Sequence, residues 1–323
     1  MQTKPLKNEL LSDKPNKKPN LFIVGAPKCA TSALYSYLSQ HPDIFFSKIK
    51  EPNFFASDLY PRETKTEDKD LARYLSLFEK AQSEKYIGEA STWYLYSEEA
   101  ASKIKKLAPS AKIIIMLRNP VDVTYSLHSQ LVYGGIENIT DFQEALNAEE
   151  ERKLGLRLPN KNLDSICYKR LIYTEIAKFY QQVKRYFNVF GAENVHVITF
   201  EDFKKDPGKV YREVLSFLGL NAEHSVDFRK VNANKVRRFD TKAIQQFRNH
   251  PLNLWLVRTF LPVEIRRLLF RKLARLAGKI NTKYVERISM DASFRQSLQK
   301  EFAEDIENLS LLLQRDLTSW LSN

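Results

Sequence analysis

The stretch Leu21-Phe22-Ile23-Val24-Gly25-Ala26-Pro27-Lys28-Cys29-Ala30-Thr31-Ser32 decides how this chain folds. Its four leading apolar residues have the length of a buried strand, and Gly25 opens a turn. The two hydroxyl residues at its end lead into residues 33–38, which have a helical pattern. Backbone N–H groups and the helix dipole favour an anion at such a helix start, and Lys28 adds a full charge. We therefore predict that residues 25–32 cradle a phosphorylated cofactor.

This loop departs from the usual phosphate-binding pattern, which ends in Gly-Lys followed by Ser or Thr. Lys28 instead lies in the turn, midway between Gly25 and Thr31. From there its ammonium can reach a bridging or leaving-group oxygen as well as a terminal phosphate. The alternative is an ordinary strand-turn-helix unit with a solvated lysine.

Further strand-like segments alternate with helical ones along the chain. Strands are predicted over residues 21–24, 44–47, 86–89, 112–117 and 195–200, and helices over 97–107 and 168–187. The unbroken apolar run at 113–117 is typical of a strand that is buried on both faces. The pattern predicts a doubly wound α/β domain, whose ligands bind at the carboxyl ends of the strands.

A second anion site is predicted after residues 112–117. Arg118 ends that strand, Pro120 opens the next helix, and Ser126 follows within the helix. The Arg118 guanidinium and the Ser126 hydroxyl suit a second phosphate. The alternative is a structural salt bridge for Arg118 and a solvent-facing Ser126. Because both sites follow strands of one sheet, they indicate a ligand with two separated phosphates.

Composition limits the kinds of partner and the cellular compartment that we expect for this protein. The 323 residues carry 51 Lys+Arg against 39 Asp+Glu, a net charge of +12, and this excess favours anionic partners. Two cysteines form no disulfide framework, and no zinc-like spacing appears, so no metal is expected. Without a signal-peptide core or an apolar run of about 18 residues, we expect a soluble cytoplasmic protein. Its basic tail, residues 1–19, is expected to be disordered.

The chain after residue 241 reads as helical. Residues 253–280 interleave apolar side chains with arginines, and Pro262 divides them into two helices. Such basic amphipathic helices can lie on an anionic membrane, cover an acidic substrate or pack one stripe on the core. We expect a single domain over residues 20–323, with a basic helical insertion or cap at about 241–290. Residues 294–320 are predicted to form one amphipathic helix.

Taken in order, these motifs resemble those of the sulfotransferases that use 3′-phosphoadenylyl sulfate (PAPS). Residues 25–34 resemble their 5′-phosphosulfate loop, and residues 118–126 resemble their 3′-phosphate motif. Residues 40–42, 50–52 and 54–55 are similar to the bacterial and glycan-modifying branch, which is heparan-sulfate-sulfotransferase-like, and the match continues to residue 220. The resemblance implies a P-loop-NTPase-like three-layer fold with a mainly parallel central sheet and a helix-rich C-terminal part.

The resemblance also implies roles for individual residues. Lys28 stabilises the leaving group, Glu51 acts as the base, and Glu89 and His128 are weaker candidates for substrate contact. An ion pair of Glu51 with Lys48 or Lys50 is the alternative, and His128 is the competing base. PAPS would be bound, and adenosine 3′,5′-bisphosphate (PAP) released, by the residues Gly25, Ala26, Pro27, Lys28, Cys29, Ala30, Thr31, Ser32, Arg118, Ser126, Lys235 and Arg238. No metal is implied.

Local sequence adds two expectations about this site. Pro52 is expected to hold Glu51 in an extended conformation, beside aromatic Phe54 and Phe55. Ala30 stands where the family usually has glycine, so the turn must avoid positive φ there or bear a small strain. The family's late Lys/Arg-Gly element is missing, and Lys235 or Arg238 is expected to supply its charge.

The acceptor is expected to be a glycan, a glycolipid or another hydroxyl compound, with possible peripheral membrane contact through the basic helices. Two other functions compete with this one. A nucleotide-dependent, kinase-like phosphotransferase would need the Gly-Lys-Ser/Thr cradle, which is absent. A non-enzymatic module for anionic polymers or membranes would use the +12 charge. Nucleic-acid binding is not expected, since the basic residues are spread along the chain.

Overall fold

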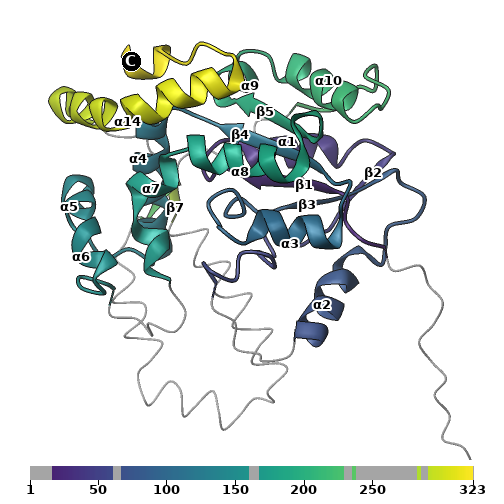
Figure 1. Ribbon diagram of the computed structural model, residues 1–323, viewed down its shortest axis with the longest axis horizontal. Coiled ribbons are helices and arrows are strands. Elements are labelled where there is room, and N and C mark those ends of the chain that lie inside the picture. The colour runs from purple at the N-terminus through teal and green to yellow at the C-terminus, as the bar shows by residue number, and fades with distance from the viewer. Residues whose placement is uncertain are drawn as a thin grey trace, which may run out of the picture.

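A parallel sheet of five strands forms the centre of the molecule. The computed structural model (Figure 1) describes residues 17–60, 67–159, 167–228, 235–237, 282–284 and 290–322. The strand order is β2-β3-β1-β4-β5, and all neighbours are parallel. The strands are β1 (Leu21–Gly25), β2 (Ile44–Phe46), β3 (Tyr86–Ala90), β4 (Lys112–Leu117) and β5 (Val195–Thr199). Each lies within one residue of its predicted bounds, and the predicted α/β fold is confirmed.

Helices cover this sheet and carry its connections. Helix α1 packs against α10, and α3 packs against α8. The helices in chain order are α1 (Thr31–Leu38), α2 (Glu67–Leu75), η1 (Ser76–Phe78), α3 (Ala100–Leu107), α4 (Pro120–Gly134), α5 (Phe142–Asn147), α6 (Glu149–Lys153), η3 (Tyr168–Leu171), α7 (Tyr173–Ala177), α8 (Tyr180–Phe190), η4 (Ala192–Asn194), α9 (Phe200–Lys205), α10 (Pro207–Phe217), α14 (Ala292–Leu313) and α15 (Ser319–Ser322). Two short strands, β6 (Lys235–Arg237) and β7 (Thr282–Tyr284), pair antiparallel.

The predicted helix over 168–187 is wrong, because the segment divides into η3, α7 and α8. Side chains from other turns satisfy the backbone at the break. The Asp305 carboxylate of α14 accepts the N–H groups of Phe179 and Tyr180, at 2.7 and 3.2 Å, where α8 begins. The Gln182 amide donates to the carbonyls of Glu175, Ile176 and Lys178, which end α7. These partners replace the hydrogen bonds that a continuous helix would make.

The predicted helix over 294–320 is also interrupted. Helix α14 ends at Leu313, and Gln314 follows in the left-handed region with φ of 49°. The chain then turns before the short α15, in which Trp320 is buried. A left-handed residue after the last turn is a common helix stop, and here it returns the chain toward the core.

Several predictions lie outside the described residues. They concern residues 1–16, Arg238 and nearly all of the basic segment 241–290. The division into a tail, a single domain and a cap therefore stays a prediction. Among the helices that the structure describes, none is both long and apolar enough to cross a membrane.

Candidate active site

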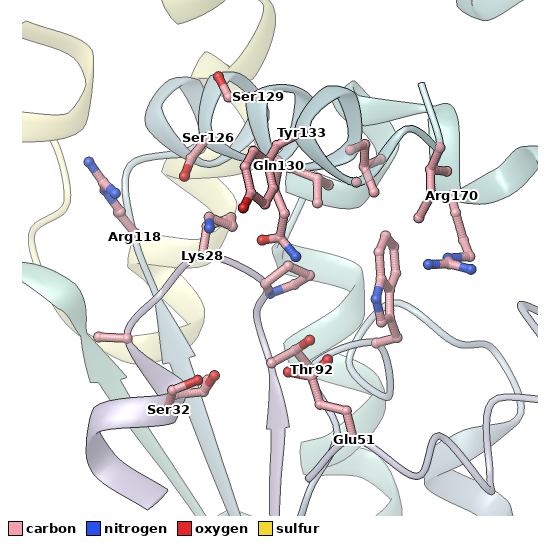
Figure 2. Close-up of a pocket in the computed structure, with 18 of the residues that line it drawn as sticks. Lys28, Ser32, Glu51, Thr92, Arg118, Ser126, Ser129, Gln130, Tyr133 and Arg170 are labelled. Atoms are coloured by element: carbon pink, nitrogen blue, oxygen red, sulfur yellow. The ribbon is translucent and has the colours of Figure 1, made fainter. Parts of the chain in front are cut away.

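A cavity of about 660 Å³ opens at the carboxyl ends of the central strands. The turn after β1 contributes Lys28, the turn after β4 contributes Arg118, and Trp93 follows β3. Figure 2 shows Lys28 and Arg118 in the same part of this cavity, below helix α4 with Ser126. The two predicted anion sites thus face one space, as parallel strands of one sheet dictate.

The loop after β1 reaches the cavity through a tight turn. The Ala26 N–H donates to the Met116 carbonyl of β4 over 2.6 Å, which ties the loop to the sheet. Lys28 and Ala30 both lie in the left-handed region, with φ of 68° and 65°. The turn was predicted either to avoid positive φ at Ala30 or to bear a small strain there, and it bears the strain. Helix α1 has no side-chain cap at its N-terminus, so its first N–H groups suit an anion.

Not every residue of the loop lines the cavity. Pro27, Lys28, Ala30, Thr31 and Ser32 do, whereas Gly25, Ala26 and Cys29 are absent from its lining. A Cβ on Gly25 would lie 2.6 Å from the Leu95 Cβ, so this glycine serves close packing. The Cys29 thiol is fully buried, and burial raises its pKa.

Arg118 both faces the cavity and makes an ion pair. Its Nη2 lies 3.0 Å from an Asp122 carboxylate oxygen, and Asp122 also binds Arg295 of α14 at 3.1 Å. The guanidinium lies 4.6 Å from the centre of the Phe200 ring. Its Nε is buried and finds no hydrogen-bond partner among the described residues. The salt bridge named as the alternative is therefore present, and it leaves the Nε donor unused.

Ser126 is buried and lines the cavity, so the alternative of a solvent-facing side chain is wrong. It is brought there by the sharp start of α4. The Asn119 side chain accepts the Val121 N–H over 3.0 Å, and Pro120 takes the first helical position. Both features favour a helix start directly after Arg118.

Glu51 lines the same cavity, but its backbone is not extended as predicted. Its φ is 59°, in the left-handed region, although Pro52 follows. The reason is a hydrogen bond of 2.9 Å from its N–H to the Ala90 carbonyl at the end of β3. The Glu51 carboxylate pairs with Lys50 at 2.7 Å, and 38% of its side chain is exposed. Phe54 and Phe55 pack on Tyr74.

Glu89 and His128 lie outside the lining of the cavity. Glu89 is 1% exposed and accepts hydrogen bonds from Tyr74, Ser91 and Tyr94. Burial raises the pKa of Glu89 to about 7, although these hydrogen bonds lower it. His128 is also buried, its Nε2 donates to the Ile139 carbonyl over 2.9 Å, and burial lowers its pKa. Neither is placed to touch a ligand in the cavity.

The structure describes neither of the two late basic side chains. Lys235 begins β6, and its side chain lies outside the described residues, as does Arg238. Among the residues that are described, no group of three His, Cys, Asp or Glu side chains could hold a metal ion.

Sequence reasoning missed Arg170, which lines the cavity beside Tyr60 and Trp93. Arg170 falls in the segment that was predicted as one helix, where a basic residue next to Lys169 is typical of a solvated face. Its two aromatic neighbours are distant in the sequence. The only signal that could have drawn attention to Arg170 is that the helix predicted over 168–187 stops at Leu171, where η3 ends.

Comparison with known proteins identifies the fold family. A sequence model of the sulfotransferase domain matches residues 18–253. A sulfotransferase from Alicyclobacillus acidocaldarius has a similar solved structure, with a TM-score of 0.66 and 31% identity. That match covers 94% of this chain and 99% of the other.

Curated relatives include the bifunctional heparan sulfate N-deacetylase/N-sulfotransferase 1 of Xenopus laevis. It is 28% identical over 221 residues, which cover 67% of this chain and 23% of the relative. The carbohydrate sulfotransferase 15 of Rattus norvegicus is 27% identical over 251 residues, which cover 62% of this chain and 44% of the relative. The chain thus matches less than half the length of these relatives.

Proposed function

This chain belongs to the sulfotransferase domain family, and on that premise we propose that it moves a sulfuryl group from PAPS to a hydroxyl or amine of a carbohydrate or glycolipid. The observation that carries the proposal is that Lys28 and Arg118 line one cavity at the carboxyl edge of the sheet. The choice of a glycan acceptor is supported by the heparan sulfate and carbohydrate sulfotransferases among the relatives.

The side chains at this edge suit a donor with phosphate at both ends of its ribose. The uncapped start of α1, with Thr31 and Ser32, and the Lys28 ammonium suit the 5′-phosphosulfate. Arg118 and Ser126 suit the 3′-phosphate. Arg118 lines the cavity, and its Nε has no hydrogen-bond partner among the described residues, so the guanidinium retains donors that an anion can satisfy.

The chemistry asked of the protein is charge stabilisation and one proton transfer. PAPS supplies the sulfuryl group, which bonds to the acceptor oxygen or nitrogen as the sulfur–oxygen bond to the 5′-phosphate breaks. Lys28 neutralises the charge that develops on the released phosphate oxygen. Glu51 takes the proton from the acceptor, because its carboxylate lines the same cavity.

The ion pair of Glu51 with Lys50 does not remove it from this role. Both side chains are partly exposed, at 38% and 21%. Exposed pairs contribute at most about 1 kcal/mol, so an acceptor hydroxyl can replace the ammonium. His128 is the weaker base, since a backbone carbonyl occupies its Nε2.

Ligand-induced thermal stabilisation tests the donor assignment. We expect PAP to raise the melting temperature far more than adenosine 5′-phosphate, ATP with magnesium or heparin. Arg118→Gln should lower the affinity for PAP by about 10- to 100-fold, since it removes charged hydrogen bonds, and should leave the affinity for adenosine 5′-phosphate unchanged. Equal stabilisation by ATP with magnesium would favour the phosphotransferase, and stabilisation by heparin alone the non-enzymatic module.

Sulfate transfer from labelled PAPS to a panel of glycans and glycolipids tests the activity itself. Lys28→Ala should reduce turnover by at least about 100-fold, because it removes a charge that acts in the transition state. Lys48→Ala is the matched control, since Lys48 is an exposed lysine that does not line the cavity. A Lys28→Ala enzyme with normal turnover would exclude the proposed role.

A further inference from the structure

Arg170 is almost buried in the wall of the cavity, although it is a charged residue. Only 9% of it is exposed. Its guanidinium carbon lies 4.3 Å from the centre of the Tyr60 ring and 4.9 Å from the centre of the Trp93 ring. Both rings stabilise the cation through their faces.

These rings do not satisfy the hydrogen bonds that a guanidinium can donate. A guanidinium has five N–H donors, and aromatic rings are poor acceptors for them. In the described part of the chain, Arg170 forms no ion pair, and its buried Nε has no hydrogen-bond partner. A buried donor that is left unsatisfied is unfavourable. A ligand in the cavity can supply acceptors to the part of the guanidinium that lines it.

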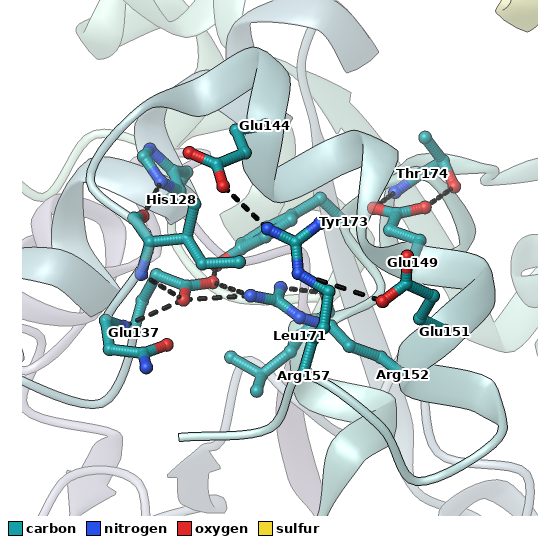
Figure 3. A network of polar contacts seen from close by, with 12 residues as sticks. His128, Glu137, Glu144, Glu149, Glu151, Arg152, Arg157, Leu171, Tyr173 and Thr174 are labelled. Carbon is teal, nitrogen blue, oxygen red and sulfur yellow. Dashed lines mark hydrogen bonds and ion pairs between the residues drawn. The ribbon is translucent and has the colours of Figure 1, made fainter. Parts of the chain in front are cut away.

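The backbone that carries Arg170 is held by a buried polar network (Figure 3). Arg152 of α6 pairs with Glu137 at 2.8 Å, and both side chains are fully buried. The other end of the Arg152 guanidinium donates to the Leu171 carbonyl over 3.1 Å, next to Arg170. The Tyr173 hydroxyl closes the network on Glu137 over 2.6 Å. Such a support suits a residue that must present its charge at a fixed place.

Arg170 lies on the side of the cavity where the acceptor is expected. In Figure 2 it stands apart from Lys28, Arg118 and Ser126, across the cavity. The cation therefore lies away from the proposed phosphate sites, in the wall that Tyr60 and Trp93 form.

We propose that Arg170 binds a carboxylate or sulfate group of the acceptor, which would therefore be an acidic saccharide. This inference rests on the proposed function, since it presupposes that the protein transfers a sulfuryl group to an acceptor. The planar guanidinium fork matches either anion with two parallel hydrogen bonds. The Trp93 ring lines the cavity beside it and adds apolar surface to this wall.

Two saccharides that differ in one group test the proposal. One is a methyl disaccharide with a uronic acid, and the other carries the uncharged uronamide at the same carbon. Calorimetry on the PAP-saturated protein gives their affinities, and labelled PAPS gives their turnover. We expect the acid to bind at least about 10-fold more tightly than the amide, as a charged hydrogen-bond pair implies. Arg170→Gln should remove this preference and leave amide binding within about twofold.

Three variants separate recognition from structure. Arg170→Lys keeps the charge but loses the fork, so its preference should be intermediate. Lys169→Gln removes the neighbouring charge, which pairs with Glu98 at 3.7 Å outside the cavity, and should keep the full preference. Equal binding of acid and amide to the wild type, binding of neither, or a parallel loss of both in a folded Arg170→Gln would overturn the inference. Binding of the uronic acid disaccharide without any sulfated product would instead contradict the proposed function.

Discussion

The Ser91 hydroxyl donates a 2.5 Å hydrogen bond to the buried Glu89 carboxylate, and its oxygen accepts the Asn53 N–H over 3.1 Å. Tyr94 repeats the arrangement, since its hydroxyl donates to Glu89 over 3.0 Å and accepts the Phe55 N–H over 3.3 Å. One buried carboxylate therefore orients two hydroxyls that hold the backbone next to Glu51. Glu89 does not line the cavity, and we propose that it positions the proposed base through these hydroxyls.

Removing the Ser91 hydroxyl should loosen this loop without touching a ligand. For Ser91→Ala we expect kcat to fall about 10-fold, because small displacements of a reacting group are costly. The KM for PAPS should stay unchanged, since Lys28 and Arg118 are unaffected. Steady-state kinetics with separate kcat and KM values measure the effect.

Tyr74→Phe is the matched control for this prediction. The Tyr74 hydroxyl also donates to Glu89, over 2.8 Å, but it holds no N–H of the loop, and its ring stacks on Phe54. Phenylalanine keeps that stacking, so kcat should change less than in Ser91→Ala. If both variants lose the same activity, the effect comes from Glu89 as a whole and not from the tie to Asn53.

Glu89 should also make stability depend on pH. Its pKa is about 7 in the folded chain against an ordinary 4.5, and burial is the main cause. Between these values the folded protein keeps a proton that the unfolded chain has released. The free energy of unfolding should therefore fall as pH rises through this window, by about 3 kcal/mol in total.

Denaturant unfolding of the wild type and Glu89→Gln at several pH values isolates this contribution. Glu149 and Asp305 also have raised pKa values, about 7 and about 6, but they contribute equally to both proteins. From pH 4.5 to 8, the unfolding free energy of Glu89→Gln should rise relative to that of the wild type. Parallel curves would mean that Glu89 does not titrate in this window.

Ala30 carries backbone strain that glycine would relieve. An L-residue in the left-handed region costs about 1–2 kcal/mol, and Ala30 has φ of 65°. Glycine gains entropy in the unfolded chain, which offsets part of this relief, so we expect Ala30→Gly to give a net stabilisation of about 0.5–1 kcal/mol in urea unfolding. Ala33→Gly in helix α1 should destabilise it by about 1 kcal/mol. Destabilisation by both would show that the turn is not strained.

The sheet could be predicted from the sequence because its signal is local. Each central strand is a short apolar run that ends in a turn or helix-capping residue. Leu117 is followed by Arg118 and the helix-starting Asn119-Pro120, and Thr199 ends β5 by accepting the Asp202 N–H. The parallel order then places Lys28 and Arg118 at one edge.

The parts that were missed depend on contacts between distant residues. The helix over 168–187 is broken by Asp305, which lies more than 120 residues further along the chain. Glu51 is turned by the end of β3, which no local rule for a residue before proline contains. Arg170 joins the cavity through Tyr60 and Trp93. In each case the deciding partner is brought near only by the folded sheet.

The buried pair of Arg152 and Glu137 gives the sharpest test of how the wall that carries Arg170 is held. Arg152→Met would leave the Glu137 carboxylate buried without its partner, which costs about 3–5 kcal/mol. Lys153→Met, the next residue of α6, breaks only the exposed pair with Glu150 and should cost less than about 1 kcal/mol. Adding Glu137→Gln to Arg152→Met should recover part of the loss, because the uncompensated charge is then gone. If the double variant is no more stable than Arg152→Met in denaturant unfolding, the loss comes from the Leu171 carbonyl and packing, and not from the stranded carboxylate.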